Sequence, residues 1–212
     1  MLDTRIKICG ITSVADAQFS LQAGADYLGL IFAESARRID VETARAIRQT
    51  VPSAMLIGVF RDAPLDGVVK TGGACGLDLV QLHGVESPEY CSALLKRLSR
   101  PVIKAFRVDE LSDFRILREY TKTSYFMLDL DKNHNPAKRL NGHREALWAT
   151  ASTLRGQGYR IFLAGGLNPD NVQEAVRRVD PYGIDVASGV EKSPGVKDTE
   201  AVTRFITEAR KW

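Results

Sequence analysis

The chain has 212 residues, which is enough for one substantial hydrophobic core. Its residues are 44% hydrophobic and 26% charged, as in ordinary globular proteins, and its net charge of +3 comes from interspersed signs, which excludes a basic tract for nucleic acid or anionic lipid. The longest apolar run, Tyr27–Ala33, is too short to span a bilayer, and the three cysteines (Cys9, Cys75 and Cys91) are too scattered for a metal site or a disulfide framework.

Short apolar runs alternate along the chain with amphipathic stretches of helical spacing. Several of the runs are hydrophobic throughout, which is typical of strands that are covered on both faces. The sequence predicts strands over Ile6–Ile11, Tyr27–Phe32, Met55–Phe60, Leu77–Leu82, Val102–Val108, Tyr125–Leu130, Ile161–Ala164 and Ile184–Ala187. It predicts helices over Ala15–Ala23 (after a Ser13 cap), Val41–Thr50, Pro88–Leu98, Glu110–Tyr120, Glu145–Leu154, Asn168–Val179 and Thr199–Lys211, with a weaker one over Pro64–Gly73.

This alternation indicates a parallel sheet with right-handed crossovers. Eight strand signals favour a closed (β/α)₈ barrel in one domain, residues 1–212, and an open doubly wound sheet is the alternative. A barrel of this kind carries its active site at the carboxyl ends of the strands. The residues that matter are therefore the polar ones that follow each run.

Two glycine-containing turns follow the last two predicted strands. Gly165-Gly166 comes after the seventh strand, and Ser188-Gly189 comes after the eighth. In barrels these two loops often bind phosphate through backbone N–H groups, because glycine allows a close approach. Glycines also make plain tight turns, but two such turns in these loops favour a phosphate site.

A thiol and a carboxylate end two other strands. Cys9 precedes Gly10 at the end of the first strand, and it is either a small core residue or a reactive thiol. Asp129 ends the apolar run Tyr-Phe-Met-Leu, where a carboxylate must be solvated, paired or functional. Asp131 would point to the same side and is the alternative.

Further polar residues lie at the same predicted rim. Arg37 and Arg38 follow the second strand and, as neighbours on an extended segment, point to opposite faces. His83 follows the fourth strand, where it serves either as a structural hydrogen-bonding group or, with Gln81, in substrate binding. Asp185 lies within the eighth strand.

Several segments of the chain are similar to those of one known family. They read "KICGIT", "GADYLGLIF" followed by Ser-x-Arg, "GVF", "VQLHG", "MLD", "LAGGLNPDNV" and "DVASGVEKSPGVKD", in this order between residues 5 and 208. They closely resemble phosphoribosylanthranilate isomerase of tryptophan biosynthesis. The resemblance implies a (β/α)₈ barrel and an Amadori rearrangement of an aminoaldose phosphate to an aminoketose phosphate, with no metal or organic cofactor.

The resemblance also implies roles for individual residues. Cys9 matches the general base and Asp129 the general acid. Arg37 matches the arginine that meets the anthranilate carboxylate, and Asp185 matches a carboxylate near the substrate's polar atoms. The glycine turns match the phosphate site. The acid must carry its proton at working pH, which an apolar setting favours, and the base must reach the thiolate, which positive surroundings favour.

One segment departs from the family pattern. Relatives carry a glycine-rich stretch followed by Phe-Asp-Trp after the acid, whereas this chain reads "DLDKNHNPAKRLNGHREALWATAS", and only Asn141-Gly142 and Trp148 are similar. The segment Asp131–Trp148 covers the substrate in the family, so its change bears on substrate range. Its additional positive charges either reach the substrate's anionic ends or coat a surface loop (Lys132, Lys138, Arg139 and Arg144).

Two other functions stay open at this point. One is a catalytically silent barrel that binds a phosphorylated ligand, and the other is an isomerase of a related aminoaldose phosphate. The presence of both proton-transfer residues argues against the first. We expect a small phosphorylated substrate, no nucleic-acid or membrane partner, and a monomer or homodimer. The start of the sequence lacks the apolar core of a signal peptide and carries Asp3, so we expect a reduced, cytoplasmic protein.

Overall fold

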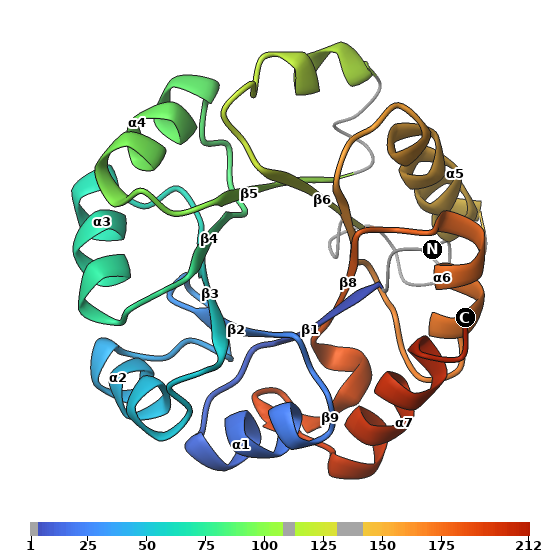
Figure 1. The fold of residues 1–212 in the computed structure, drawn as a ribbon, viewed down its shortest axis with the longest axis horizontal. Helices are drawn as coiled ribbons and strands as arrows, with labels where there is room; N and C mark the ends of the chain where they lie inside the picture. The colour runs from blue at the N-terminus through green and yellow to red at the C-terminus, as the bar shows by residue number, and fades with distance from the viewer. Residues whose placement is uncertain (1–3, 108–112, 131–141) are drawn as a thin grey trace.

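The computed structural model describes residues 4–107, 113–130 and 142–212. Eight parallel strands close into a barrel in the order β1 to β8, each paired with its sequence neighbour and β8 paired with β1 (Figure 1). The expected closed barrel is confirmed, and the open sheet is excluded. The strands are β1 Arg5–Cys9, β2 Tyr27–Ile31, β3 Met55–Phe60, β4 Leu79–Leu82, β5 Val102–Arg107, β6 Tyr125–Asp129, β7 Ile161–Leu163 and β8 Gly183–Val186.

Helices surround this barrel on the outside (Figure 1). Their first turns are held by side-chain caps that the sequence supplies: Ser13, Asp40, Ser87 and Asp198 each accept a hydrogen bond from a backbone N–H at the start of a helix. The helices are α1 Val14–Gln22, α2 Val41–Thr50, α3 Leu65–Ala74, α4 Pro88–Leu98, α5 Gly142–Gly156, α6 Val172–Val179 and α7 Thr199–Ala209. In the described residues no helix is long and apolar enough to cross a membrane.

One predicted helix is not found as such. Between β5 and β6 the sequence pattern predicts a helix over Glu110–Tyr120, but the described part of it is a 3-10 helix, Phe114–Arg118. Asp113 caps this turn through the N–H of Arg115, and the hydroxyl of Tyr120 donates to the carbonyl of Glu86 at 3.0 Å. The chain therefore turns back to the barrel after one tight turn. Residues 108–112 lie outside the described residues.

Side chains alternate between the two faces of each strand, and they form two hydrophobic cores. One set points outward to the helices, and the other fills the barrel with side chains such as Ile57, Ile103, Met127 and Phe162. The inward set of β1 is unusual, because it contains Lys7 and Cys9 in place of aliphatic residues. The barrel interior thus becomes polar toward the carboxyl ends of β1 and β8.

The chain after β8 adds a short helix and a hairpin at this polar end of the barrel. A short 3-10 helix, Ser188–Val190, leads into an antiparallel hairpin of β9 Glu191–Ser193 and β10 Val196–Lys197. Gly195 makes the turn with a φ of +84°, a conformation that glycine adopts without strain. Thr12, just after β1, donates to the Gly195 carbonyl at 2.5 Å, so the hairpin is joined to the start of the chain.

Candidate active site

The predicted site residues do lie at the carboxyl ends of the strands. Around the barrel, Asp129 ends β6, the Gly165-Gly166 turn follows β7, Asp185 lies on β8, and Cys9 ends β1. Arg37 follows β2. Strands β7 and β8, whose loops are the candidate phosphate site, therefore lie between the strand that ends at Asp129 and the strand that ends at Cys9.

Cys9 is held at the mouth by close contact with the neighbouring strand. Its side chain is buried, and a Cβ on Gly29 would lie 2.7 Å from its Sγ, so only glycine fits beside it. Burial raises the pKa of the Cys9 thiol, and the Asp185 carboxylate raises it further, whereas Lys7 and Lys197 act in the opposite direction. The positive surroundings expected from the sequence are thus present, but burial outweighs them.

Lys7 is a member of this site that sequence reasoning missed. It is aligned with Asp185 across β1 and β8, and its Nζ lies 2.9 Å from Oδ1 of that carboxylate. Burial would lower the pKa of Lys7, but Asp185 and Cys9 together outweigh it and raise the pKa. The signal was present in the sequence, since residues two apart on a strand share a face and Lys7 precedes Cys9 by two.

Asp129 belongs to a chain of three polar side chains. Its Oδ2 lies 3.4 Å from Nε2 of His83, and its Oδ1 accepts from the N–H of Leu130 at 2.7 Å. The Nδ1 of His83 lies 2.9 Å from the amide nitrogen of Gln81, which is buried inside the barrel. An amide N–H that donates to Nδ1 leaves the proton of a neutral imidazole on Nε2, facing Asp129. His83 therefore contacts the candidate acid, and Gln81 holds the far side of the His83 ring.

Arg37 lies in a network that the sequence did not reveal. Its Nε and Nη2 donate to the carboxylate of Glu191 at distances from 2.6 to 3.0 Å. Glu191 also accepts from Nζ of Lys197 at 2.9 Å, and Lys197 donates to the carbonyl of Cys9 at 2.5 Å. Burial would raise the pKa of Glu191, but the hydrogen bonds from Arg37 and Lys197 lower it below its usual range. Arg38, in contrast, is exposed.

The two candidate phosphate loops are packed against each other. A Cβ on Gly189 would lie 2.0 Å from the carbonyl oxygen of Leu167, so any side chain there would separate the loops. Gly165 and Gly166 have φ values of +86° and +77°, and Gly166 and Ser188 are exposed. In the described part of the chain the backbone N–H groups of Gly165 and Gly166 donate to no acceptor. Such groups suit an anion.

The departing segment of the sequence is described only at its end. Asp131 and the basic residues Lys132, Lys138 and Arg139 lie outside the described residues. Helix α5 begins at Gly142, and within it Trp148 is buried between two guanidinium groups, with the Cζ atoms of Arg144 and Arg178 at 5.3 and 5.1 Å from its ring. Arg144 thus covers an aromatic ring on the outside of the barrel.

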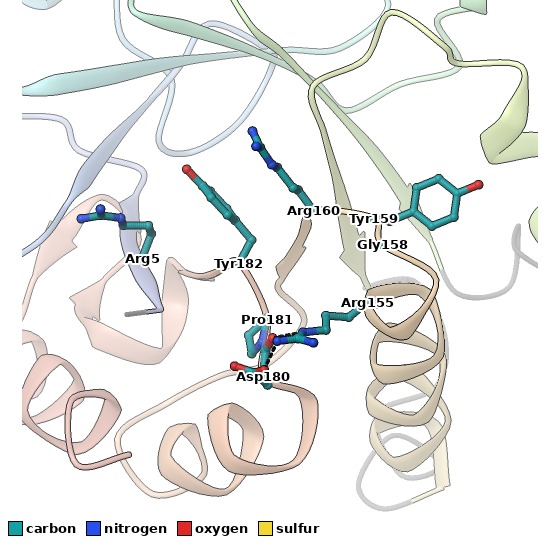
Figure 2. A pocket seen from close by; sticks show the side chains of 8 residues that line it. All are labelled: Arg5, Arg155, Gly158, Tyr159, Arg160, Asp180, Pro181 and Tyr182. Carbon is teal, nitrogen blue, oxygen red and sulfur yellow. Dashed lines mark hydrogen bonds and ion pairs between the residues drawn. The ribbon is translucent and has the colours of Figure 1, made fainter. Parts of the chain in front are cut away.

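A pocket of about 550 Å³ lies at the opposite end of the barrel (Figure 2). Its lining comes from the residues that precede β7 and β8, together with Arg5 at the start of β1. Its carboxylate, Asp180, is already paired with Arg155 (Figure 2), and Arg5 contacts Asp26. It holds no thiol and no unpaired carboxylate, so the polar mouth at the other end is the better candidate for chemistry.

Within the residues that the structure describes, no three His, Cys, Asp or Glu side chains are grouped closely enough to hold a metal ion. The polar mouth holds a thiol and a carboxylate, which can exchange protons, and backbone N–H groups, which suit an anion. A thiol, a carboxylate, a guanidinium and two glycine turns at the carboxyl ends of eight parallel strands define a (β/α)₈-barrel enzyme of acid–base type.

Comparison with known proteins places the chain within this class. Residues 6–208 match the family described as N-(5'phosphoribosyl)anthranilate (PRA) isomerase, and the chain belongs to this family. The N-(5'-phosphoribosyl)anthranilate isomerase of Geobacter sp. (strain M21) is 49% identical over 210 residues, which are 98% of each chain.

Solved structures agree with this assignment. The crystal structure of phosphoribosyl anthranilate isomerase from Thermotoga maritima has a TM-score of 0.88 and 34% identity, and covers 99% of this chain and 100% of its own. A phosphoribosyl anthranilate isomerase in complex with reduced 1-(o-carboxyphenylamino)-1-deoxyribulose 5-phosphate has a TM-score of 0.82 and 34% identity, with the same coverage.

Proposed function

We propose that this chain converts N-(5-phosphoribosyl)anthranilate to 1-(2-carboxyphenylamino)-1-deoxyribulose 5-phosphate in tryptophan biosynthesis, with Cys9 as general base and Asp129 as general acid. The observation that carries the proposal is the placement of these two groups on either side of the glycine loops after β7 and β8. A phosphate held by those loops leaves the ribose between a thiol and a carboxylate.

The reaction needs two proton transfers. The carboxyl of Asp129 gives its proton to the furanose ring oxygen, the C1–O bond breaks, and a protonated Schiff base forms. The thiolate of Cys9 then removes the proton from C2, which yields an enolamine that tautomerises to the ketone. The reaction is an isomerisation, so the two side chains return to their starting states by exchanging protons with solvent. Each positioned group contributes about 10²–10⁴ in rate.

The residues next to the acid and the base position these two groups. The imidazole of His83, with Gln81 behind it, contacts the Asp129 carboxylate and orients one of its oxygens. Lys7 lies next to Cys9 on the same face of β1 and favours the thiolate by its charge, while Asp185, which is paired with Lys7, acts in the opposite direction. The resemblance to the family also assigns Asp185 a place near the substrate's polar atoms.

The protein binds the substrate at its two anionic ends, the phosphate and the ring carboxylate. The backbone N–H groups of Gly165 and Gly166, with Ser188 and Gly189 on the facing loop, bind the phosphate. Arg37 binds the ring carboxylate through the part of its guanidinium that Glu191 does not occupy. These two contacts fix the aminoaldose in the orientation that the proton transfers require.

We further propose that the protein works in the cytoplasm, as a monomer or a homodimer. Its three cysteines are free and buried, which suits a reducing compartment. Light scattering of the purified protein decides between the two oligomeric states.

A fluorescence assay tests the proposed activity. Phosphoribosylanthranilate is supplied to the purified protein, and its fluorescence is followed as the anthranilate amine is converted to the aminoketose. We expect loss of the signal with saturation kinetics and competitive inhibition by inorganic phosphate. Unchanged fluorescence at micromolar protein would overturn the proposed function.

A further inference from the structure

The pairing of Arg37 with Glu191 leaves part of the guanidinium unused. Glu191 accepts from Nε and from Nη2, at 2.8 and 2.6 Å for the two shortest contacts. A guanidinium has five N–H donors, so both hydrogens of Nη1 and one of Nη2 remain. Among the described residues Nη1 donates to no acceptor. These remaining donors form a second edge that can bind another carboxylate with two parallel hydrogen bonds.

The position of this second edge is fixed from two sides. The aliphatic part of Arg37 passes over Gly10, whose absent Cβ would lie 2.6 Å from the Arg37 Cδ. Glu191, on β9, is itself held by Nζ of Lys197 on β10, whose side chain is fully buried. Arg37 therefore cannot rotate away without losing the Glu191 carboxylate or colliding with the strand end.

Lys197 joins the same network to the candidate base. Its Nζ donates to the carbonyl of Cys9 at 2.5 Å and lies 3.4 Å from the carbonyl of Ala187. The hairpin is thus attached to the ends of both β1 and β8. Lys197 and Glu191 therefore fix the position of the Arg37 side chain relative to the backbone of Cys9.

The charge of this network also points to an anionic ligand. Arg37 and Lys197 are both cationic, and Glu191 is the one carboxylate that they share. The three groups therefore carry one excess positive charge, of which the outer edge of Arg37 is the accessible part. A buried ion network of this kind is a poor means of stabilising a fold, because desolvation offsets most of the attraction.

We propose that Glu191 is a positioning residue for substrate recognition: it holds one edge of Arg37 so that the other edge binds the aromatic carboxylate of the substrate, and Lys197 ties this pair to the strand end that carries Cys9. The inference rests on the proposed function, since it takes that substrate as the ligand. It assigns a task to two residues, Glu191 and Lys197, that do not themselves need to touch the substrate.

Steady-state kinetics of E191Q test the inference. The amide keeps the shape but loses the charge and one acceptor, so Arg37 is no longer held in one orientation. We expect KM to rise roughly 10- to 100-fold, with kcat within about three-fold of wild type. E145Q is the matched control, because Glu145 pairs with both terminal nitrogens of Arg178 on the outside of the barrel and its loss should leave KM unchanged.

Two further measurements separate positioning from a merely structural role. In an R37A background, E191Q should change kcat/KM by less than about two-fold, because Glu191 acts through Arg37. The reduced product analogue should lose affinity for E191Q, whereas the same analogue without its ring carboxylate should bind both proteins equally. If E191Q folds poorly, E191D, which keeps the charge on a shorter side chain, is measured in the same way.

Equal losses with both analogues, or an effect of E191Q that persists in the R37A background, would overturn the inference. These outcomes are distinct from failure of the proposed function. If the proposed function failed, the wild-type protein itself would not convert phosphoribosylanthranilate. An active wild type with an unchanged KM in E191Q would overturn the positioning role alone.

Discussion

Replacing Gly10 by alanine should disable the binding of the ring carboxylate by displacing Arg37, while every side chain that contacts the substrate stays chemically unchanged. Gly10 has a φ of +76°, and a Cβ there would lie 2.6 Å from Cδ of Arg37, with the next two atoms of that side chain at 3.4 and 3.5 Å. The new methyl group would displace the stem of Arg37, and Glu191 prevents a compensating rotation.

The expected size of the effect follows from the contact that is lost. Charge-assisted hydrogen bonds contribute about 1.5–3 kcal/mol, which corresponds to roughly 10- to 150-fold in affinity. We therefore expect kcat/KM of G10A to fall by that factor, mainly through KM. Left-handed backbone at alanine costs about 1–2 kcal/mol, which for a chain of this length lowers Tm by roughly 2–8 °C.

The assay is steady-state loss of phosphoribosylanthranilate fluorescence, with thermal unfolding measured in parallel. G158A is the matched control: Gly158 has a φ of +91°, and nothing lies within 4 Å of its Cβ position at the far end of the barrel. It should show a similar fall in Tm and a normal KM. A normal KM in G10A, or an equal rise of KM in G158A, would refute the steric reasoning.

The loops and the base give two further expectations. In G189A the Cβ would lie 2.0 Å from the carbonyl oxygen of Leu167, so thermal unfolding should show a larger loss of stability than in G73A, where the Cβ position is open and the backbone is helical; equal losses would contradict the packing of the two loops. Burial raises the pKa of Cys9, so kcat/KM should fall as the pH drops through that value, because only the thiolate accepts a proton. Since the charge of Lys7 lowers this pKa, the pH profile of K7Q should move to higher pH, and a shift to lower pH would contradict the assignment.

The barrel could be predicted because its determinants are local. Eight apolar runs spaced between amphipathic stretches specify strands and helices without knowledge of any distant contact. The first strand ends at Cys9, before the predicted end at Ile11, because Gly10 takes a positive φ. The helix predicted over Glu110–Tyr120 was wrong in its described part, since the contact of Tyr120 with the Glu86 carbonyl lies outside any local pattern.

The candidate site could be predicted only in part. Position at a strand end located Cys9 and Asp129. The partner of Arg37 could not be read from the sequence, because Glu191 is 154 residues away and meets it only when the barrel closes. Lys7 could have been found, since alternation along β1 places it on the face of Cys9.

The kcat values of C9S and D129N test the central claim most directly. Both substitutions are nearly isosteric, so Tm should change little, and C91S, which alters a buried cysteine on α4, is the control that should keep wild-type kcat. If Cys9 and Asp129 are the base and the acid, each variant should lose at least about 100-fold in kcat. Retention of more than about a tenth of wild-type kcat by either folded variant would contradict its role as an essential proton-transfer group.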